Sequence, residues 1–334
     1  MYLARFPRRR YFQGQTPIEK LSRLSQKLGG PTLHMKRDDL LLGLTGGGSK
    51  TRKLEFLVAE ALAQDADTLI TGGAVQSNHC RLTLAAAVRE GMKCRLVLEE
   101  RIAGSYNPDA GGNIFLFRLL GVEEIRVVPG GSDMMRKMQR LADDTRKAGR
   151  KPYIIPVGGS NATGDLGYVA CAEEILNQCF ESGLVIDHIV CASGSGGTQS
   201  GLIAGFYGNR APIPVIGINV VRNKTDQEEL VYRLATGAAA YMGISTDIPR
   251  DAVNCLDDYL GPGYSLPTAA MAEAVRLTAR TEGILLDPCY TGKAMAGLVD
   301  LVRKGYFKKE EQVLFLHTGG IPALYAEGSE ILDG

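Results

Sequence analysis

Apolar runs typical of β-strands alternate with runs of helical periodicity along most of this chain. The apolar runs lie at 68–73, 94–100, 124–131, 152–160, 187–193, 214–221 and 312–320. Between several of them apolar residues recur at helical spacing, as at 54–63, 113–120 and 132–148. Ahead of this alternation, the chain predicts an N-terminal arm, a helix at 17–28 and a strand at 32–39. Wholly apolar strands separated by helices predict an α/β fold with parallel, twisted sheets covered by helices.

Four loops share one composition, in which an apolar strand is followed by glycines and hydroxyl residues and then by a helix. They lie at 71–80, 158–164, 193–201 and 318–320. In open α/β sheets, ligands bind at the carboxyl ends of the strands. We therefore expect these loops to converge on one crevice.

A glycine-rich loop, TGGGSK at 45–50, places Lys50 just before a helical run. Positive potential at a helix N-terminus lowers the pKa of a nearby lysine and favours the neutral amine, which is the form that attacks an aldehyde. The loop is not a phosphate-binding P-loop, because counting from Gly43 places Ser49 where the motif needs lysine. Taken alone, the stretch is equally consistent with a flexible loop and an exposed lysine.

The segment SGSGGT (193–198) follows an apolar strand and opens a helix. Glycines allow close backbone approach, and a helix N-terminus offers oriented N–H groups, so the segment predicts a phosphate-binding loop. It is not a dinucleotide fingerprint, because Gln199 replaces the last glycine of G-x-G-x-x-G. A plain tight turn is the alternative interpretation.

Several other polar residues follow predicted strands. Ser77 or Asn78 is placed either to cap a helix or to bind ligand oxygens, and His79 alone is more typical of a packed side chain. Tyr264 and Tyr290 lie in glycine-flanked loops, where tyrosines are candidates for proton transfer or ring contacts.

The composition excludes several other functions. With 38 Lys and Arg against 37 Asp and Glu, the net charge of +1 supports neither nucleic-acid nor membrane-surface binding. The seven cysteines contain no C-x-x-C pair and predict thiols in a reducing cytoplasm, and four scattered histidines give little support for a metal. A lysine in a glycine loop, a separate phosphate-binding loop and no nucleotide motif together suggest pyridoxal phosphate (PLP) as the cofactor.

Seven motifs occur in matching order along nearly the whole chain: GGSKTRKLEFLVAEAL, QSNH, IPVGGSN, SGSGGT, PGYSLP, LLDPCYTGKAMAGL and HTGGIPALYA. Together they resemble the D-cysteine desulfhydrase and aminocyclopropane-carboxylate (ACC) deaminase family of PLP enzymes, to which L-cysteate sulfo-lyases also belong. The resemblance implies the two-domain PLP fold type II, similar to the tryptophan synthase β subunit. We expect a large domain at 1–50 and 162–334, and a small domain at 51–161.

The resemblance also implies roles for individual residues. Lys50 would bind the cofactor covalently with Lys53 nearby, Asn78 would contact its ring oxygen, and Thr318 its pyridine nitrogen. The phosphate would lie on Ser193, Gly194, Ser195, Gly196, Gly197 and Thr198. Ser77, Tyr264 and Tyr290 would act with Lys50 in catalysis, and further substrate contacts would come from Ser49, Gln76, Ser77, Asn78, His79 and Thr291.

Some residues depart from the family pattern. The deaminase pattern has a glutamate directly after the tyrosine that matches Tyr290, whereas Thr291 follows here, which favours β-elimination over opening of the cyclopropane ring. Leu82 also replaces a residue that is often glutamine. Ser49, Gln199 and Ser200 replace other family residues, and these polar groups would suit the three oxygens of a sulfonate.

We therefore predict a homodimeric, cytoplasmic, PLP-dependent carbon–sulfur β-lyase that acts on a small amino acid and binds neither nucleic acid nor membranes. The main prediction is cleavage of L-cysteate to pyruvate, sulfite and ammonia. The alternative is cleavage of D-cysteine to pyruvate, sulfide and ammonia. An ACC deaminase and a non-catalytic PLP-binding protein are less favoured.

Overall fold

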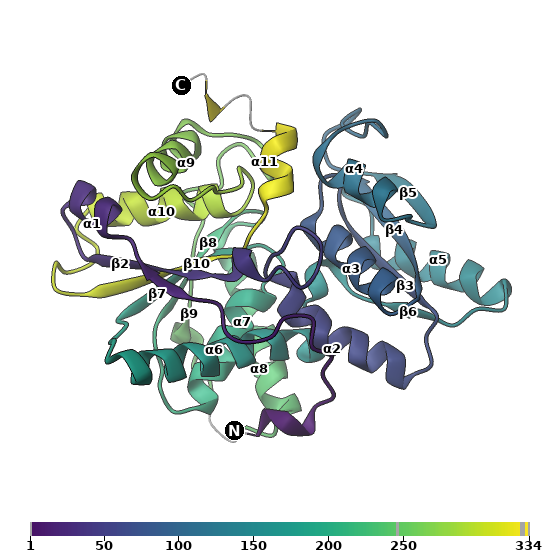
Figure 1. Cartoon of the computed structure of the whole chain (residues 1–334), viewed down its shortest axis with the longest axis horizontal. Helices are drawn as coiled ribbons and strands as arrows, with labels where there is room; N and C mark the ends of the chain where they lie inside the picture. The colour runs from purple at the N-terminus through teal and green to yellow at the C-terminus, as the bar shows by residue number, and fades with distance from the viewer. Residues whose placement is uncertain (1, 245–246, 328–330, 333–334) are drawn as a thin grey trace.

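The strands of the described part of the chain form two sheets (Figure 1). The computed structural model describes residues 2–244, 247–327 and 331–332. In its six-stranded sheet the strands follow the order β1 (Ile18–Lys20), β2 (Thr32–Arg37), β10 (Gln312–His317), β7 (His188–Ser193), β8 (Val215–Asn219) and β9 (Val253–Leu256). All neighbours pair in parallel except β1 and β2.

Helices cover both faces of the six-stranded sheet (Figure 1). One face packs against α1 (Ser22–Leu28), α9 (Ala269–Glu282) and α10 (Thr291–Arg303), and the other against α6 (Ala162–Ser182), α7 (Gly197–Gly208) and α8 (Lys224–Tyr241). Strand β10 shows why both faces are apolar. Val313 and Phe315 enter the first core, and the alternate residues Leu314 and Leu316 enter the second.

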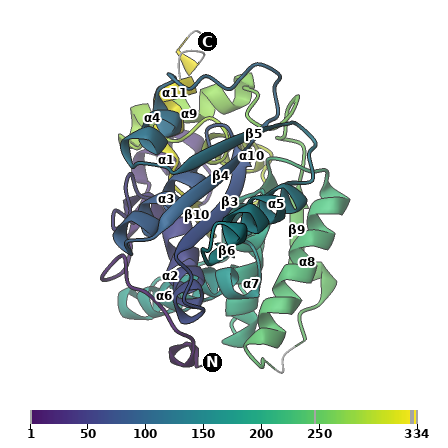
Figure 2. The same ribbon diagram turned by 90° about the vertical axis from the view of Figure 1, so that its right-hand side faces the viewer.

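The second sheet has four parallel strands (Figure 2). Their order is β5 (Glu124–Pro129), β4 (Lys93–Glu100), β3 (Thr68–Ala74) and β6 (Pro152–Ile154). One face packs against α2 (Lys50–Ala63), α3 (Asn78–Arg89) and α4 (Gly112–Leu119), and the other against α5 (Met134–Lys147). The remaining elements are α11 (Ile321–Glu327) and short 3-10 turns at Leu3–Arg5, Asp38–Leu40, Val157–Gly159 and Arg250–Ala252. Across the described ranges, no helix is long and apolar enough to cross a lipid bilayer.

The two parallel, helix-covered sheets confirm the predicted fold class, with one local correction. The helix predicted at 17–28 is wrong in its first part, because Ile18–Lys20 forms β1 and pairs antiparallel with β2. The hydrogen bonds at the edge of the sheet determine that this segment is a strand, and local periodicity does not show them. All strands of the four-stranded sheet lie within the predicted small domain, while the boundaries at 51 and 161 stay a prediction.

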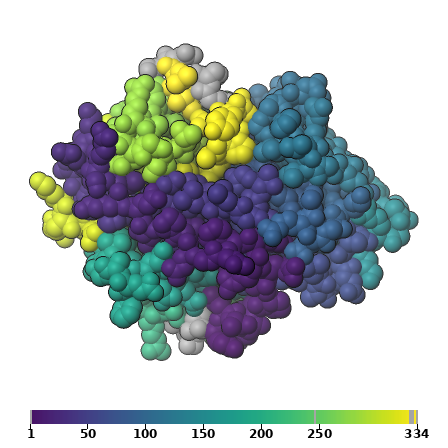
Figure 3. Space-filling view, viewed as in Figure 1, coloured from purple at the N-terminus to yellow at the C-terminus, as the bar shows by residue number. Residues whose placement is uncertain are grey.

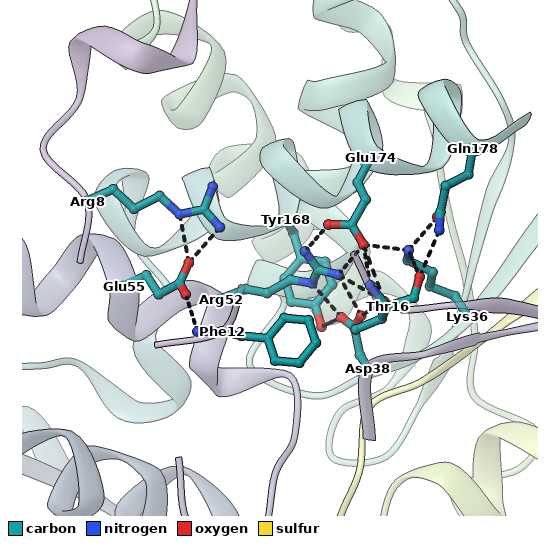
Figure 4. Close-up of polar contacts among 10 residues, drawn as sticks. All are labelled: Arg8, Phe12, Thr16, Lys36, Asp38, Arg52, Glu55, Tyr168, Glu174 and Gln178. Carbon is teal, nitrogen blue, oxygen red and sulfur yellow. Dashed lines mark hydrogen bonds and ion pairs between the residues drawn. The ribbon is translucent and has the colours of Figure 1, made fainter. Parts of the chain in front are cut away.

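The N-terminal arm lies across one face of the molecule, in purple in Figure 3. A cluster of buried charges fixes it there (Figure 4). Arg52, two residues beyond Lys50, pairs with Asp38 and with Glu174, each at 2.8 Å. The Thr16 hydroxyl of the arm donates a hydrogen bond of 2.9 Å to Asp38. The start of α2 is therefore anchored to both the arm and α6.

Candidate active site

The carboxyl ends of strands from both sheets meet at one pocket. The loops after β3, β4, β6, β7, β8 and β10 line it, together with the loop before α2. Each of the four loops predicted to converge contributes at least one residue, including Ser77, Gly158, Ser195 and Thr318. The predicted crevice is therefore present, and it lies between the two sheets.

Lys50 is the first residue of α2 and lines this pocket. The preceding Gly48 has a φ of +122°, a conformation that favours glycine, and the Ser49 amide donates a 3.0 Å hydrogen bond to the Thr318 carbonyl. The Lys50 amine lies 3.4 Å from the Ser49 hydroxyl. Burial, helped by the charge of Lys53, lowers the pKa of Lys50 to about 7. A neutral, nucleophilic amine is thus accessible near neutral pH.

The SGSGGT loop (Ser193–Thr198) joins β7 to α7, which begins at Gly197. Gly194, Ser195, Gly196 and Thr198 line the pocket, and Gly196 has a φ of +84°. The Ser193 hydroxyl instead donates to the Gln199 side chain at 2.7 Å and accepts from Gln227. Ser193 and Gly197 do not line the pocket, and the Gly197 amide donates to the Ser160 hydroxyl at 3.3 Å. The N-terminus of α7 still begins at the pocket, and a helix N-terminus favours a bound anion.

Lys53 lies behind the SGSGGT loop. Its amine donates to the Gly158 carbonyl (3.2 Å) and to the Ser160 hydroxyl (2.9 Å), and it lies 3.7 Å from the Asp165 carboxylate. Ser160 in turn donates to the Ser195 hydroxyl at 2.8 Å. Lys53 is thus linked to the SGSGGT loop through the Ser160 hydroxyl. A direct contact between Lys53 and the cofactor stays a prediction.

The start of α3 combines a capping role with a place in the pocket. The Ser77 hydroxyl caps α3 by accepting from the Cys80 amide, and Ser77, Asn78 and His79 all line the pocket. His79 shares a 2.8 Å hydrogen bond with the Thr71 hydroxyl, and burial lowers its pKa well below the ordinary value. A neutral, packed histidine fits this environment better than a catalytic base.

Four residues that were predicted to contact the substrate form hydrogen bonds within the protein instead. The Gln76 side chain accepts from the Asn113 amide and donates to the Gly111 carbonyl, which holds the loop before α4. The buried Thr291 hydroxyl donates to Asp287 at 2.7 Å. Gln199 bonds to β8 and β9 carbonyls, and Ser200 donates to Asp165. The expectation that Gln199 and Ser200 offer donors to a sulfonate is therefore wrong, because both point into the core.

Tyr264 and Tyr290 come together at the pocket. Their hydroxyl oxygens lie 2.6 Å apart, and their rings pack edge to face with centroids 5.7 Å apart. Burial raises the pKa of both tyrosines, so each keeps its proton at neutral pH. Thr318 lines the pocket at the end of β10, and Ser49 lines it beside Lys50. The structure thus brings these four predicted residues together around the lysine.

Three arginines in the pocket were missed by sequence reasoning: Arg81, Arg101 and Arg222. Arg81 is fully buried, and the hydrogen bonds of its guanidinium go to neutral groups, the side chains of Asn113 and Asn78 and the carbonyls of Thr45 and Gly47. The position of each arginine in the chain could have indicated that it lies in the pocket. Arg81 follows Asn78 by three residues on the same helix face, and Arg101 and Arg222 follow strands β4 and β8.

The residues present fit PLP. Its aldehyde needs a neutral lysine, which Lys50 provides, and its phosphate needs N–H donors, which the SGSGGT loop provides. A Cβ on Gly196 would lie 2.9 Å from Leu234, and one on Gly194 would lie 3.4 Å from the Tyr290 ring. At Gly196, where φ is also positive, the loop therefore has space only for glycine.

Comparisons with known proteins agree with this chemistry. Residues 9–319 match the family described as pyridoxal-phosphate dependent enzyme. The chain is 44% identical to a 1-aminocyclopropane-1-carboxylate deaminase of Burkholderia multivorans, with 100% of each chain covered. It is 43% identical to a D-cysteine desulfhydrase of Salmonella typhimurium, with 97% of each chain covered.

A solved structure described as an ACC deaminase homologue superposes with a TM-score of 0.89. It is 39% identical and covers 99% of this chain and 97% of its own. The match extends over the elements that build the pocket. This chain belongs to the family of pyridoxal-phosphate dependent enzymes.

Proposed function

We propose that this enzyme is a carbon–sulfur β-lyase that converts a small cysteine-like amino acid to pyruvate and ammonia. The observation that carries the proposal is the meeting of Lys50, of lowered pKa, with the Tyr264–Tyr290 pair and the SGSGGT loop in one pocket. When bound, PLP supplies the electron sink for cleavage of bonds to the α- and β-carbons of the substrate.

The protein side chains would move the protons. Lys50 has a pKa of about 7, so its amine can both accept and return a proton at neutral pH. Tyr264 and Tyr290 stay protonated and offer one shared donor to a departing sulfur group. Ser77 and Asn78, at the N-terminus of α3, face the pocket where N–H groups favour a substrate carboxylate.

D-Cysteine is the candidate that the relatives support. Relatives that are 43% and 44% identical over 97% of this chain carry the name D-cysteine desulfhydrase. With water, D-cysteine would give pyruvate, ammonia and hydrogen sulfide. L-Cysteate, which would give sulfite instead, is a second candidate, because Arg101 and Arg222 line the pocket and can attract a sulfonate.

ACC deamination is less favoured, although relatives at 41% and 44% identity carry that name. Thr291 replaces the glutamate of the deaminase pattern, and its hydroxyl is held by Asp287. Among the described residues that line the pocket, none is an aspartate or glutamate. The site therefore has no carboxylate in place to assist opening of a cyclopropane ring.

Product analysis tests the proposal. The purified holoenzyme would be incubated separately with D-cysteine, L-cysteine, L-cysteate and ACC, with keto acid, sulfide and sulfite as readouts. Pyruvate with sulfide or sulfite supports a carbon–sulfur lyase and identifies the leaving group. Ketobutyrate from ACC would mean that Thr291 does not exclude deamination, and cofactor binding without keto acid would indicate a non-catalytic protein. We also propose a homodimer, which sedimentation equilibrium can test.

A further inference from the structure

Two arginines from different sheets meet beside the tyrosine pair. Arg101 directly follows β4 of the four-stranded sheet, and Arg222 lies three residues beyond β8 of the six-stranded sheet. We propose that Arg101 and Arg222 form an anion subsite that binds a second negative charge, carried by the β-substituent of the amino-acid substrate. This inference rests on the proposed lyase function and narrows its substrate class.

The position of Arg101 connects the subsite to the catalytic tyrosines. The carbon at the centre of its guanidinium lies 4.0 Å from the centroid of the Tyr264 ring, and Tyr264 shares its hydrogen bond with Tyr290. A group departing toward the tyrosine hydroxyls therefore leaves beside the Arg101 charge. Stacking on the ring also holds the planar guanidinium in one orientation.

Among the described residues, no acidic side chain accepts a hydrogen bond from Arg222. Its guanidinium donates to the Gly194 carbonyl at 2.8 Å and to the Gln227 side chain at 3.3 Å, and both acceptors are neutral. Arg101 and Arg222 line the same pocket and repel each other: burial, and then the charge of Arg101, lowers the pKa of Arg222, whereas the charge of Asp226 raises it. An anion bound between them would relieve this repulsion.

Arg101 has one acidic neighbour, Glu99, whose carboxylate accepts from its Nε at 2.7 Å. Glu99 also accepts from the Gly131 amide, so it is fixed outside the pocket lining. Of the described residues that do line the pocket, none is acidic. Glu99 therefore offsets the charge of Arg101 from outside the pocket, while the described pocket lining itself offers the two arginines no acidic side chain.

The other negative charges of the reactants have sites of their own. The SGSGGT loop at the start of α7 suits the cofactor phosphate. The first turn of α3, which includes the buried Arg81, suits the α-carboxylate of the substrate, because among the described residues the Arg81 guanidinium has only neutral hydrogen-bond partners. Arg101 and Arg222 are then left to bind the side chain of the substrate. A thiol is mostly uncharged at neutral pH, whereas a sulfonate or sulfinate is fully ionised.

The test compares a charged with uncharged β-substituents in the holoenzyme. L-Cysteate carries the extra charge, and D-cysteine and β-chloroalanine do not. In Arg101→Met and Arg222→Met we expect kcat/KM for L-cysteate to fall about 10- to 100-fold, while that for β-chloroalanine falls much less. Arg222→Lys, which keeps the charge, should recover part of the loss.

Arg250→Met is the matched control. Arg250 also stacks on a tyrosine, with its guanidinium carbon 4.3 Å from the Tyr232 ring, but it is an exposed residue outside the pocket. Three results would overturn the inference. They are an equal loss of kcat/KM in Arg250→Met, an equal loss of kcat/KM for charged and uncharged substrates in the other variants, and a higher wild-type kcat/KM for the uncharged substrates.

A binding measurement separates this inference from the proposed function. L-Cysteate and L-serine would be titrated against the cofactor absorbance of the holoenzyme and of each variant. The subsite predicts weaker binding of L-cysteate alone in the two methionine variants. If no substrate yields keto acid but this selective loss of binding is seen, the lyase proposal fails and the anion subsite stands. If L-cysteate binding is unchanged, the subsite is refuted whatever the activity.

Discussion

The hydroxyl oxygens of Tyr264 and Tyr290 lie 2.6 Å apart in the pocket that holds Lys50. One of the two must donate to the other, so a single proton remains to be offered to a ligand. We expect Tyr290→Phe and Tyr264→Phe each to lower kcat by about 10²-fold or more. The cofactor should stay bound, because neither hydroxyl belongs to the SGSGGT loop. Tyr306→Phe, at an exposed residue, is the control. A loss of cofactor absorbance in parallel with activity would contradict this role.

The lowered pKa of Lys50 predicts how cofactor binding depends on pH. With a pKa of about 7, the amine is mostly neutral above that pH and mostly a non-nucleophilic ammonium below it. The rate of covalent PLP attachment to the apoenzyme should therefore fall about tenfold per pH unit below 7 and level off above it. Stopped-flow absorbance measures this rate. A profile centred near pH 10 would show that Lys50 has an ordinary pKa, and Lys50→Ala should show no covalent attachment.

The buried pair of Lys53 and Asp165 predicts a charge-dependent loss of stability. Burial lowers the pKa of Lys53 and raises that of Asp165, and each charge offsets part of the other's shift. Lys53→Met leaves the Asp165 carboxylate unpaired and should lower the free energy of unfolding by about 3 kcal/mol at pH 8. The loss should shrink as pH falls, because the folded state then binds a proton on Asp165.

The double variant Lys53→Met with Asp165→Leu is the control for this pair. It removes both charges and should recover most of the stability in urea denaturation. A double variant as unstable as Lys53→Met would show that packing, and not charge, determines the effect.

The charge cluster around Arg52 predicts sensitivity to acid. Despite its burial, hydrogen bonds and charges from Arg52 and Lys36 lower the pKa of Glu174 to about 2. Its stabilising effect is complete above its ordinary pKa near 4.5 and is lost as pH falls toward 2. The free energy of unfolding of the wild type should therefore decline as the pH falls from about 4.5 to about 2. Glu174→Gln should be less stable than the wild type at pH 7, but its free energy of unfolding should decline less over this pH range. Equal slopes for the two proteins would contradict this.

Sequence reasoning was most successful where the signal is local. Apolar runs located the strands after residue 60 except β9, which was not predicted, and a glycine loop before a helical run located Lys50 at the start of α2. Sequence reasoning failed where contacts between distant parts of the chain determine where a side chain lies. Gln199 and Ser200 follow the phosphate loop, but the direction of α7 turns both toward the core. Arg101 and Arg222 share a pocket only because two separate sheets meet there, which periodicity along one chain does not show.

The hydrogen bond from the Ser49 amide to the Thr318 carbonyl joins the beginning of the chain to its end. Strand β10, which Thr318 directly follows, also pairs with β2 and so closes the six-stranded sheet late in the sequence. During synthesis on a ribosome, the lysine loop is made early but has no partner until the last strand emerges. The nascent chain should therefore acquire its ability to retain PLP only after residue 320 has left the exit tunnel, because neither sheet alone holds the lysine loop in place.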